Sequence, residues 1–210
     1  MPSIVPFACR AGAVMMECSF ARQSRQFFRM HVRPSELPDV LIIEPRTFAD
    51  GRGYFFESYH AERYAQSGLA AVFVQDNLSR SKAGTLRGLH FQRHRPQGKL
   101  VTVVRGAIFD VAVDVRRRSP TFGRWMGLVL SDENHSQLYI PPGFAHGFCV
   151  LSPEADVLYK CTDIYCPEHE RTLLWNDPTV GIEWPVTGAP LLSLKDAAGM
   201  PLDRLDLFDD

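Results

Sequence analysis

The sequence predicts an all-β fold, an antiparallel β-barrel or jelly roll with a few short flanking helices. Short apolar runs alternate with clusters of Gly, Pro, Asn and Asp, at the spacing expected of strands joined by turns. A length of 210 residues, with 45% hydrophobic and 11% aromatic residues, supplies one domain with a sizeable core. The expected strands lie, in chain order, in "VLII", "GLHFQ", "KLVTVVRG", "AIFDVAVDVR", "GRWMGLVLS", "QLYIPPG", "HGFCVLS" and "ADVLYKCTDIY".

Residues 1–29 differ in character from the rest of the chain. The stretch "CSFARQSRQFFRM" carries three arginines, follows neither a strand nor a helix pattern, and ends at a second methionine, Met30. We expect an N-terminal extension over 1–29, poorly ordered or caused by a mis-assigned start, with a transit peptide as the alternative. A single domain is expected over 30–210, with one short helix in "HAERYAQSGL" that ends at Gly68.

Composition argues against several classes of partner. A formal net charge of -1, from 23 basic and 24 acidic residues, gives no overall field that would attract nucleic acid or an anionic membrane. No apolar run approaches the roughly 18 to 20 residues of a membrane span, and the most apolar early segment is broken by Arg10. The five cysteines are odd in number and form no CxxC pair, which favours reduced thiols in the cytoplasm.

The stretch "AIFDVAVDV" shows the two-residue period of a strand. Val111 and Val113 share one face, while Asp110, Ala112 and Asp114 share the other. In a closed barrel, a polar face that turns inward lines a cavity, whereas one that turns outward is only a solvated exterior. The solvated exterior is the default interpretation for a single strand.

Several expected strands carry a polar side chain among apolar ones. "GLHFQ" offers His90 and Gln92 on one face, "FAHGF" offers His146 and "VLYKC" offers Tyr159. Each of these alone is more often a core residue with a satisfied hydrogen bond, but their recurrence favours a polar-lined pocket. In "YIPPGFAHGF", prolines and glycines stiffen the chain around His146, which suits a preorganised site.

The PxGxxH spacing of Pro141, Gly143 and His146 resembles the second half of the cupin motif. In metal-binding cupins the first half supplies two histidines as HxH and then a glutamate. Here the first half reads His90-Phe91-Gln92. An amide therefore stands where the second imidazole would be, and cations occupy the glutamate's region, at Arg93, Arg95 and Lys99.

Amides and cations are poor ligands for Zn or Fe, so we expect neither a metal nor another cofactor. A metal-dependent cupin oxygenase or isomerase is the alternative, and sensitivity to a chelator would distinguish it.

Without a metal, the same residues suit proton transfer beside a carbonyl group. A histidine such as His90 has an ordinary pKa near 6.5, which fits a general base at neutral pH. Lys99 and Arg87 can stabilise the oxyanion that forms as the proton leaves, and Tyr159 can return a proton from the opposite face. A base on one side and an acid on the other invert a stereocentre.

Ordered motifs from about Pro38 to Pro201 resemble those of the dTDP-4-dehydrorhamnose 3,5-epimerase family, which are cupin-fold enzymes of nucleotide-sugar synthesis. The motifs are "DGRGYFFES", "VQDNLSRS", "LRGLHFQ", "DVAVDVR", "SPTFG", "QLYIPPGFAHGF", "YKCTDIY", "WNDPTVGIEWP" and "LSLKD".

The resemblance implies roles for individual residues. His90 would be the base, Asp196 the carboxylate that holds it, Tyr159 the acid and Lys99 the group that stabilises the enolate. Glu170 would lie near the nucleotide end of the substrate. The substrate contacts that the resemblance implies are Arg52, Glu57, Gln75, Asn77, Arg87, His146 and Glu170.

The resemblance also implies a reaction and an assembly. The reaction is metal-independent epimerisation of a dTDP-4-keto-6-deoxyhexose at C3 and C5. The assembly is a homodimer in which the N-terminal strand around Arg52 to Glu57 reaches toward the neighbour's pocket. An epimerase that acts at one carbon only and a non-catalytic sugar-binding cupin are the alternatives, although binding alone needs no base opposite an acid. Nucleobase preference stays open, because Ile164 stands where family members often carry a thymine-stacking tyrosine, with Tyr165 one residue on.

Two geometric questions follow from the strand pattern. Strict alternation places Arg87 and His90 on opposite faces, so both can line one pocket only if the strand is bulged or bent. Gly88 suits such a bulge, and we predict one there. Asp110 is a rival to Asp196 as the carboxylate partner of either histidine.

Overall fold

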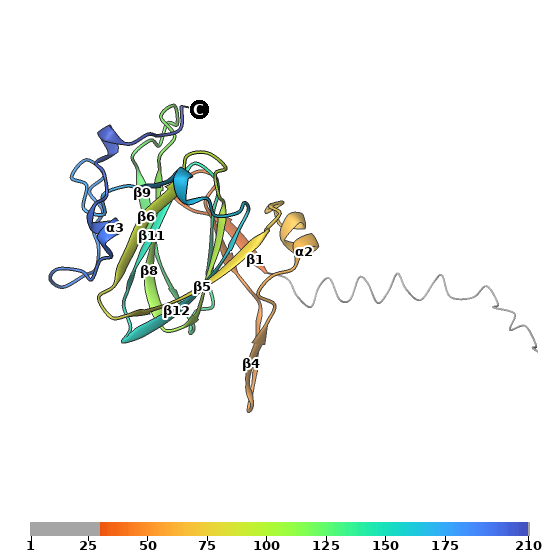
Figure 1. Ribbon diagram of the computed structural model, residues 1–210. Coiled ribbons are helices and arrows are strands. Elements are labelled where there is room, and N and C mark those ends of the chain that lie inside the picture. Colours follow the sequence, from red (N-terminus) through yellow and green to blue (C-terminus); the bar gives the residue numbers. More distant parts are fainter. Residues whose placement is uncertain (1–29, 210) are drawn as a thin grey trace, which may run out of the picture.

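In the computed structural model, which describes residues 30–209, two antiparallel sheets face each other (Figure 1). The six-stranded sheet has the order β1 (His31–Pro34), β2 (Leu41–Glu44), β10 (Gln137–Ile140), β7 (Lys99–Arg105), β12 (Glu154–Cys161) and β5 (Gln75–Lys82). The five-stranded sheet has the order β13 (Glu170–Thr172), β6 (Leu86–Gln92), β11 (Phe144–Val150), β8 (Ala107–Asp114) and β9 (Trp125–Ser131). The predicted all-β architecture is confirmed, while the expected extension over 1–29 lies outside the described residues.

A separate hairpin, β3 (Thr47–Asp50) with β4 (Gly53–Phe56), projects from the body of the domain (Figure 1). We call residues 47–56 the arm. The sequence pattern did not predict its strands. Tyr54 and Phe55 are 55% and 60% exposed on it, so the arm carries apolar surface that its own chain does not cover.

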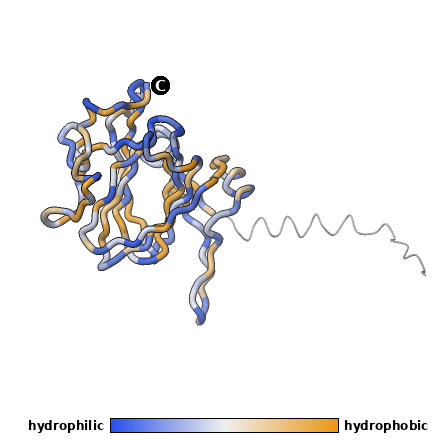
Figure 2. Tube along the Cα trace, viewed as in Figure 1, coloured by the Kyte–Doolittle hydropathy of each residue, from blue (hydrophilic) through white to orange (hydrophobic). Residues whose placement is uncertain are grey.

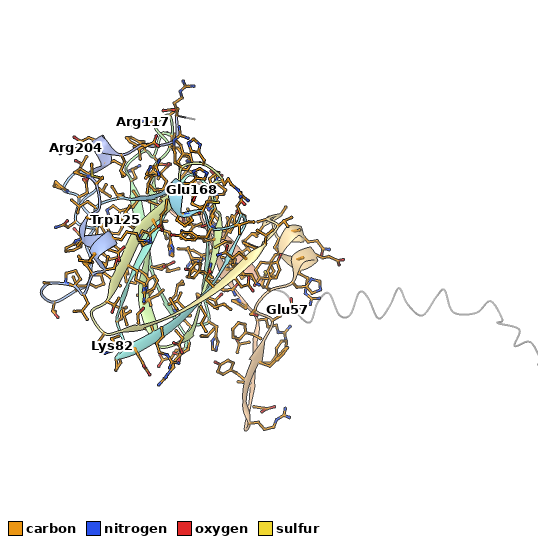
Figure 3. The ribbon with its side chains drawn as sticks, viewed as in Figure 1. Glu57, Lys82, Arg117, Trp125, Glu168 and Arg204 are labelled. Carbon is orange, nitrogen blue, oxygen red and sulfur yellow. The ribbon has the colours of Figure 1, made fainter. Side chains whose placement is uncertain are left out.

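The main core lies between the two sheets. It includes Val101 and Val103 from the larger sheet and Ile108 and Phe148 from the smaller one, all of which are buried. Side chains fill the space between the sheets (Figure 3), and the strands that enclose this space carry many of the hydrophobic positions (Figure 2). Burial of this apolar surface is the main source of stability.

Strand β8 is buried on both faces. Val111 and Val113 pack outward against Leu205 and other residues of the C-terminal segment. Asp110, on the opposite face, is 0% exposed. The default interpretation of the polar face as a solvated exterior is therefore wrong, because the polar face turns inward and the C-terminal segment covers the outer one.

The predicted short helix is α2 (Ala61–Gln66), which packs on the outer face of the larger sheet. Its Tyr64 is 1% exposed and donates a hydrogen bond to Gln137 Oε1 at 2.7 Å. The other helical elements within residues 30–209 are short: η1 (Pro167–His169), α3 (Leu194–Ala197) and η2 (Leu202–Arg204). No helix within residues 30–209 has the length and apolar character needed to cross a membrane.

The predicted bulge occurs at Gly88. His146 pairs with His90 and Phe148 pairs with Arg87, so the single β11 residue between these pairs, Gly147, faces two residues of β6, Gly88 and Leu89. Gly88 has a φ of +114°, which L side chains rarely adopt. A Cβ atom at this position would lie 2.5 Å from the Cα atom of Gly147. The bulge therefore requires glycine at a close approach of two backbones.

Gly88→Ala should destabilise the fold by about 2 to 4 kcal/mol, because the added methyl group meets backbone atoms that have no room to move. Urea denaturation followed by circular dichroism would measure the loss. Gly51→Ala is the matched control, because a Cβ there meets nothing within 4 Å. Equal stability of both variants would contradict the steric account of the bulge.

Candidate active site

A cavity of about 510 Å³ opens between the two sheets. It is lined from both sheets and from the C-terminal segment. The bulge at Gly88 brings Arg87 and His90 into this one cavity, as the strand argument required. All predicted site residues except Arg52 and Glu57 line it: Gln75, Asn77, Arg87, His90, Lys99, His146, Tyr159, Glu170 and Asp196.

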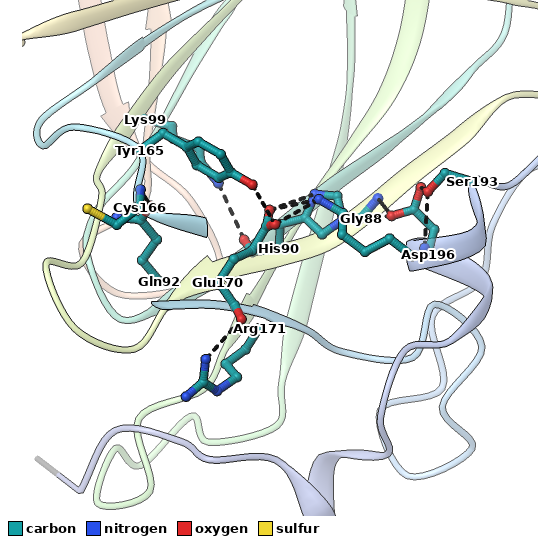
Figure 4. Close-up of polar contacts among 11 residues, drawn as sticks. Gly88, His90, Gln92, Lys99, Tyr165, Cys166, Glu170, Arg171, Ser193 and Asp196 are labelled. Carbon is teal, nitrogen blue, oxygen red and sulfur yellow. Dashed lines mark hydrogen bonds and ion pairs between the residues drawn. The ribbon is translucent and has the colours of Figure 1, made fainter. Parts of the chain in front are cut away.

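The His90 ring is hydrogen-bonded to a carboxylate more than a hundred residues away in the chain. The distance from His90 Nε2 to Asp196 Oδ1 is 2.6 Å (Figure 4). Asp196 is itself held by the Gly88 backbone N–H at 3.3 Å and by the Ser193 hydroxyl at 2.6 Å. Ser193 also caps helix α3, because its Oγ accepts from the Asp196 N–H. A serine three residues before a carboxylate is a helix-start signal, so the sequence contained a cue to this contact.

These contacts fix the protonation state of the pair. Burial alone would raise the pKa of Asp196, but the hydrogen bonds from His90 and Ser193 outweigh it and lower the pKa to about 2. An ionised carboxylate only accepts hydrogen bonds, so His90 Nε2 carries the proton that Asp196 accepts. In the neutral ring, Nδ1 is then the nitrogen with the free lone pair.

The surroundings of His90 lower its pKa and so favour the neutral ring. Burial lowers its pKa, the hydrogen bond with Asp196 partly opposes this, and the charge of Lys195 lowers the pKa further. A histidine whose pKa lies below its usual value is uncharged at neutral pH, as a general base must be.

A second imidazole–carboxylate pair faces the same cavity. His146 Nε2 lies 2.7 Å from Asp110 Oδ1, and Asp110 is fully buried. His146 on β11 is directly opposite His90 on β6. Each histidine therefore has its own carboxylate: Asp110 binds His146 and Asp196 binds His90.

Lys99 and Tyr159 come from the larger sheet. Lys99 is 9% exposed, and its Nζ donates to the His90 backbone carbonyl at 3.3 Å, while burial lowers its pKa. Tyr159 lies on β12, and burial raises its pKa, so the phenol keeps its proton at neutral pH. The two sheets thus bring a neutral base, a buried ammonium group and a phenolic proton donor to one cavity.

A row of polar side chains runs along β5. Gln75 Nε2 donates to Asn77 Oδ1 at 2.9 Å, and the Tyr165 backbone N–H donates to Gln75 Oε1 at 2.8 Å. Farther along the strand, Ser81 Oγ accepts from Arg87 Nε at 2.8 Å. Strand β5 therefore positions both the amides and the guanidinium group that line the cavity.

Glu170 lies close to His90, with Oε1 at 4.0 Å from His90 Nδ1. Lys195 donates to both Glu170 oxygens, at 2.9 and 2.8 Å, and the Tyr165 hydroxyl donates to Oε2 at 2.9 Å. Lys195 was not predicted from the sequence, although it directly precedes Asp196 in the chain. It is Tyr165 that lines the cavity, whereas Ile164 is 53% exposed.

Arg52 and Glu57 do not join the cavity of their own chain. Arg52 sits at the tip of the arm, with a side chain 91% exposed that is paired with Asp50. Glu57, at the root of the arm (Figure 3), forms an ion pair with Arg63. The two residues are therefore not paired with each other.

Known proteins share this sequence and fold. A model of the family described as dTDP-4-dehydrorhamnose 3,5-epimerase matches residues 34–204. The dTDP-4-dehydrorhamnose 3,5-epimerase of Pseudomonas aeruginosa is 56% identical over 173 residues, which cover 82% of this chain and 96% of that protein. The chain belongs to the dTDP-4-dehydrorhamnose 3,5-epimerase family.

Two solved structures of related epimerases show the same fold. The dTDP-6-deoxy-D-glucose-3,5-epimerase of Legionella pneumophila, in complex with dTDP-4-keto-L-rhamnose, matches with a TM-score of 0.82 and 51% identity over 85% of this chain and 95% of that one. A 3'-monoepimerase of Streptomyces bikiniensis, in complex with dTDP-quinovose, matches with a TM-score of 0.77 and 34% identity over 81% of this chain and 87% of that one.

In this member of the epimerase family, Gln92 has a structural task. Its Nε2 donates to the carbonyl groups of Arg95 at 2.8 Å and Ile164 at 3.3 Å, and its Oε1 accepts from the Cys166 N–H at 2.7 Å. Within residues 30–209, no three His, Cys, Asp or Glu side chains are grouped as a metal site would require. The position of the second cupin histidine is thus used to hold the 163–166 loop.

Asp196→Asn should change how stability depends on pH. Because the folded-state pKa of Asp196, about 2, lies below its unfolded value of about 3.9, its charge stabilises the fold above pH 4 and this contribution is lost as pH falls toward 2. The stability difference between the wild type and the variant should therefore shrink over that window in urea titrations. Asp203→Asn, at an exposed position, is the control. A difference independent of pH would contradict the assigned ionisation.

Proposed function

We propose that this protein converts dTDP-4-dehydro-6-deoxy-D-glucose into dTDP-4-dehydro-L-rhamnose in dTDP-rhamnose biosynthesis, by epimerisation at C3 and C5 without a metal or other cofactor. The observation that carries the proposal is the cavity itself. One sheet presents a carboxylate-bound, neutral His90 and the facing sheet presents Tyr159 and Lys99, in a chain that is 56% identical to such an epimerase. Simple binding of a sugar would need no neutral base.

The reaction follows from the acidity of carbons next to a ketone. His90 Nδ1 takes the proton from C3 or C5, and the electron pair moves through the new C=C bond onto the C4 oxygen as an enolate. Lys99 donates to that oxygen as its charge develops. The Tyr159 hydroxyl then delivers a proton to the opposite face of the same carbon. Solvent restores the proton of Tyr159 and removes the one on His90.

One set of residues can serve both carbons, because C3 and C5 are both bonded to C4. Because the same residues would also serve a single carbon, a second candidate function is an epimerase that inverts only one carbon of a related dTDP-4-keto-deoxysugar. The likeness to the S. bikiniensis 3'-monoepimerase, at 34% identity, favours considering this second function. NMR analysis of the product formed in deuterated water separates the two, since it reports which carbons invert.

His90→Asn and Tyr159→Phe should fail in different ways. His90→Asn should abolish both deuterium exchange at C3 and C5 and net inversion, because no base remains. Tyr159→Phe still forms the enolate, so deuterium should enter with retained configuration while inversion falls by about 10² to 10⁴. NMR of dTDP-4-dehydro-6-deoxy-D-glucose incubated in deuterated water measures both. Inversion at the wild-type rate in Tyr159→Phe would show that the acid lies elsewhere, with His146 the next candidate.

We further propose that the active form is a homodimer in which the arm of each chain completes the neighbour's cavity. Arg52 and Glu57, both implied as substrate contacts, do not line the cavity of their own chain. The arm projects from the domain (Figure 1) and exposes Tyr54 and Phe55. Outside the arm, Leu78 on β5 is 68% exposed, as expected of surface that a second copy covers.

Mixing two inactive variants tests the exchange of arms. Arg52→Ala damages the cavity of the neighbour, whereas His90→Asn damages the cavity of its own chain. In a mixed dimer one cavity has both defects and the other has neither, so co-expression should restore about a quarter of wild-type activity at equal amounts. Each variant expressed alone is the control. An absence of recovery in verified mixed dimers would show that Arg52 acts within its own chain.

We place the protein in the cytoplasm. The cysteines that the structure describes, Cys149, Cys161 and Cys166, are all free, and Cys149 and Cys161 are buried. Free thiols suit a reducing compartment.

A further inference from the structure

Glu170 lies between the catalytic base and a lysine. Its Oε1 is 4.0 Å from His90 Nδ1, the nitrogen left with the free lone pair. Its two oxygens accept hydrogen bonds from Lys195 Nζ at 2.9 and 2.8 Å. A carboxylate therefore lies near each nitrogen of the His90 ring (Figure 4). Asp196 is hydrogen-bonded to Nε2, and Glu170 lies 4.0 Å from Nδ1, the nitrogen that would receive the substrate proton.

This arrangement is more constrained than an ordinary surface ion pair. The Glu170 side chain is only 13% exposed, whereas that of Lys195 is 48% exposed. Strand β13 pairs with β6, with Glu170 opposite Gln92 and Thr172 opposite His90, so the backbones that carry the carboxylate and the ring are in fixed register. The Tyr165 hydroxyl holds Glu170 from a third direction.

We propose that Glu170 stabilises the proton that His90 takes up on Nδ1, and that Lys195 opposes this effect, so that the pair sets the strength of the catalytic base. The proposal rests on the proposed epimerase function for its role in catalysis. Glu170 and Lys195 are then positioning residues that act through His90.

The physical basis is the sign of the charges. An imidazolium ion on Nδ1 gains from a carboxylate at 4.0 Å, because two opposite charges at that distance attract strongly in a partly buried site. An ammonium group bound to the same carboxylate cancels part of this attraction and repels the imidazolium ion. Lys195 therefore keeps His90 neutral at rest, and Glu170 helps it hold the proton once the enolate has formed. The directions in which these two charges act on the pKa of His90 agree with this account.

Other titratable and charged groups also face His90 and act on its protonation. Because these groups stay unchanged when Glu170 or Lys195 is substituted, a difference between matched variants isolates the effect of these two residues. They are Asp196 from α3, Lys99 from β7, His146 from β11 with Asp110 from β8, Tyr159 from β12, Arg87 from β6 and Tyr165 from the loop before η1.

The test is an NMR titration of the His90 ring protons in the protein without substrate, assigned by comparison with His90→Asn. Glu170→Gln should move the titration midpoint of His90 to lower pH, and Lys195→Gln should move it to higher pH. The double variant should lie between the two. Glu154→Gln and Lys82→Gln are matched controls, because they make the same substitutions at residues that pair across β12 and β5, away from the cavity lining, and should leave the midpoint unchanged.

Kinetics give a second readout. The acid limb of kcat/KM against pH reports the base of the free enzyme, so it should shift in the same two opposite directions. A rise in KM with no movement of the His90 midpoint would assign Glu170 to nucleotide binding and overturn the proposal. Midpoints that move in the same direction in both single variants would also overturn it. Because the titration needs no turnover, opposite shifts in a protein without epimerase activity would refute the proposed function, while the effect of Glu170 and Lys195 on the protonation of His90 would stand.

Discussion

The close approach of two strand backbones at Gly88 and Gly147 decides what the cavity contains. A Cβ atom at position 88 would lie only 2.5 Å from the Gly147 Cα atom, so β6 can approach β11 this closely only if residue 88 is glycine. The resulting bulge turns Arg87 and His90 toward the same side, and it leaves the Gly88 N–H free to donate to Asp196. In a regular strand, Arg87 and His90 would point to opposite faces, and one of them would leave the cavity. The Asp196 carboxylate would also lose the hydrogen bond from the Gly88 N–H.

The C-terminal segment is attached at the start of the same strand, where the Leu86 N–H donates to the Leu191 carbonyl. It covers the outer face of the smaller sheet, with bridges from Thr85 to Leu191 and from Leu173 to Met200, and packs its apolar residues against β8. Asp196 lies between these two attachments. The segment thus closes the core on one side and delivers the carboxylate that holds the His90 ring, which links packing stability to the geometry of the cavity.

Much of the fold and of the site could be predicted from the sequence, and the exceptions have physical causes. Strands such as β7 and β8 show apolar runs that report their burial. Strand β5, "QDNLSRSK", is polar at most positions because one face lines the cavity and the other is exposed, so no apolar pattern identifies it. The arm was missed for a different reason, because its apolar run is only the three residues Tyr54 to Phe56, and its own chain leaves Tyr54 and Phe55 exposed. The contacts of Glu170 with His90 and Lys195 depend on the pairing of β13 with β6, which local sequence does not encode.

The loop held by Gln92 limits which side chains position 92 can carry. The side-chain amide of Gln92 binds three backbone groups, the carbonyls of Arg95 and Ile164 and the N–H of Cys166. Tyr165, which lies in the same 163–166 loop, lines the cavity. A histidine at position 92 has one donor and one acceptor at most in its neutral form, and a bound metal would occupy the acceptor. Gln92→His, a first step toward a cupin metal site, would therefore break hydrogen bonds that hold the 163–166 loop and so disturb the pocket that Tyr165 lines.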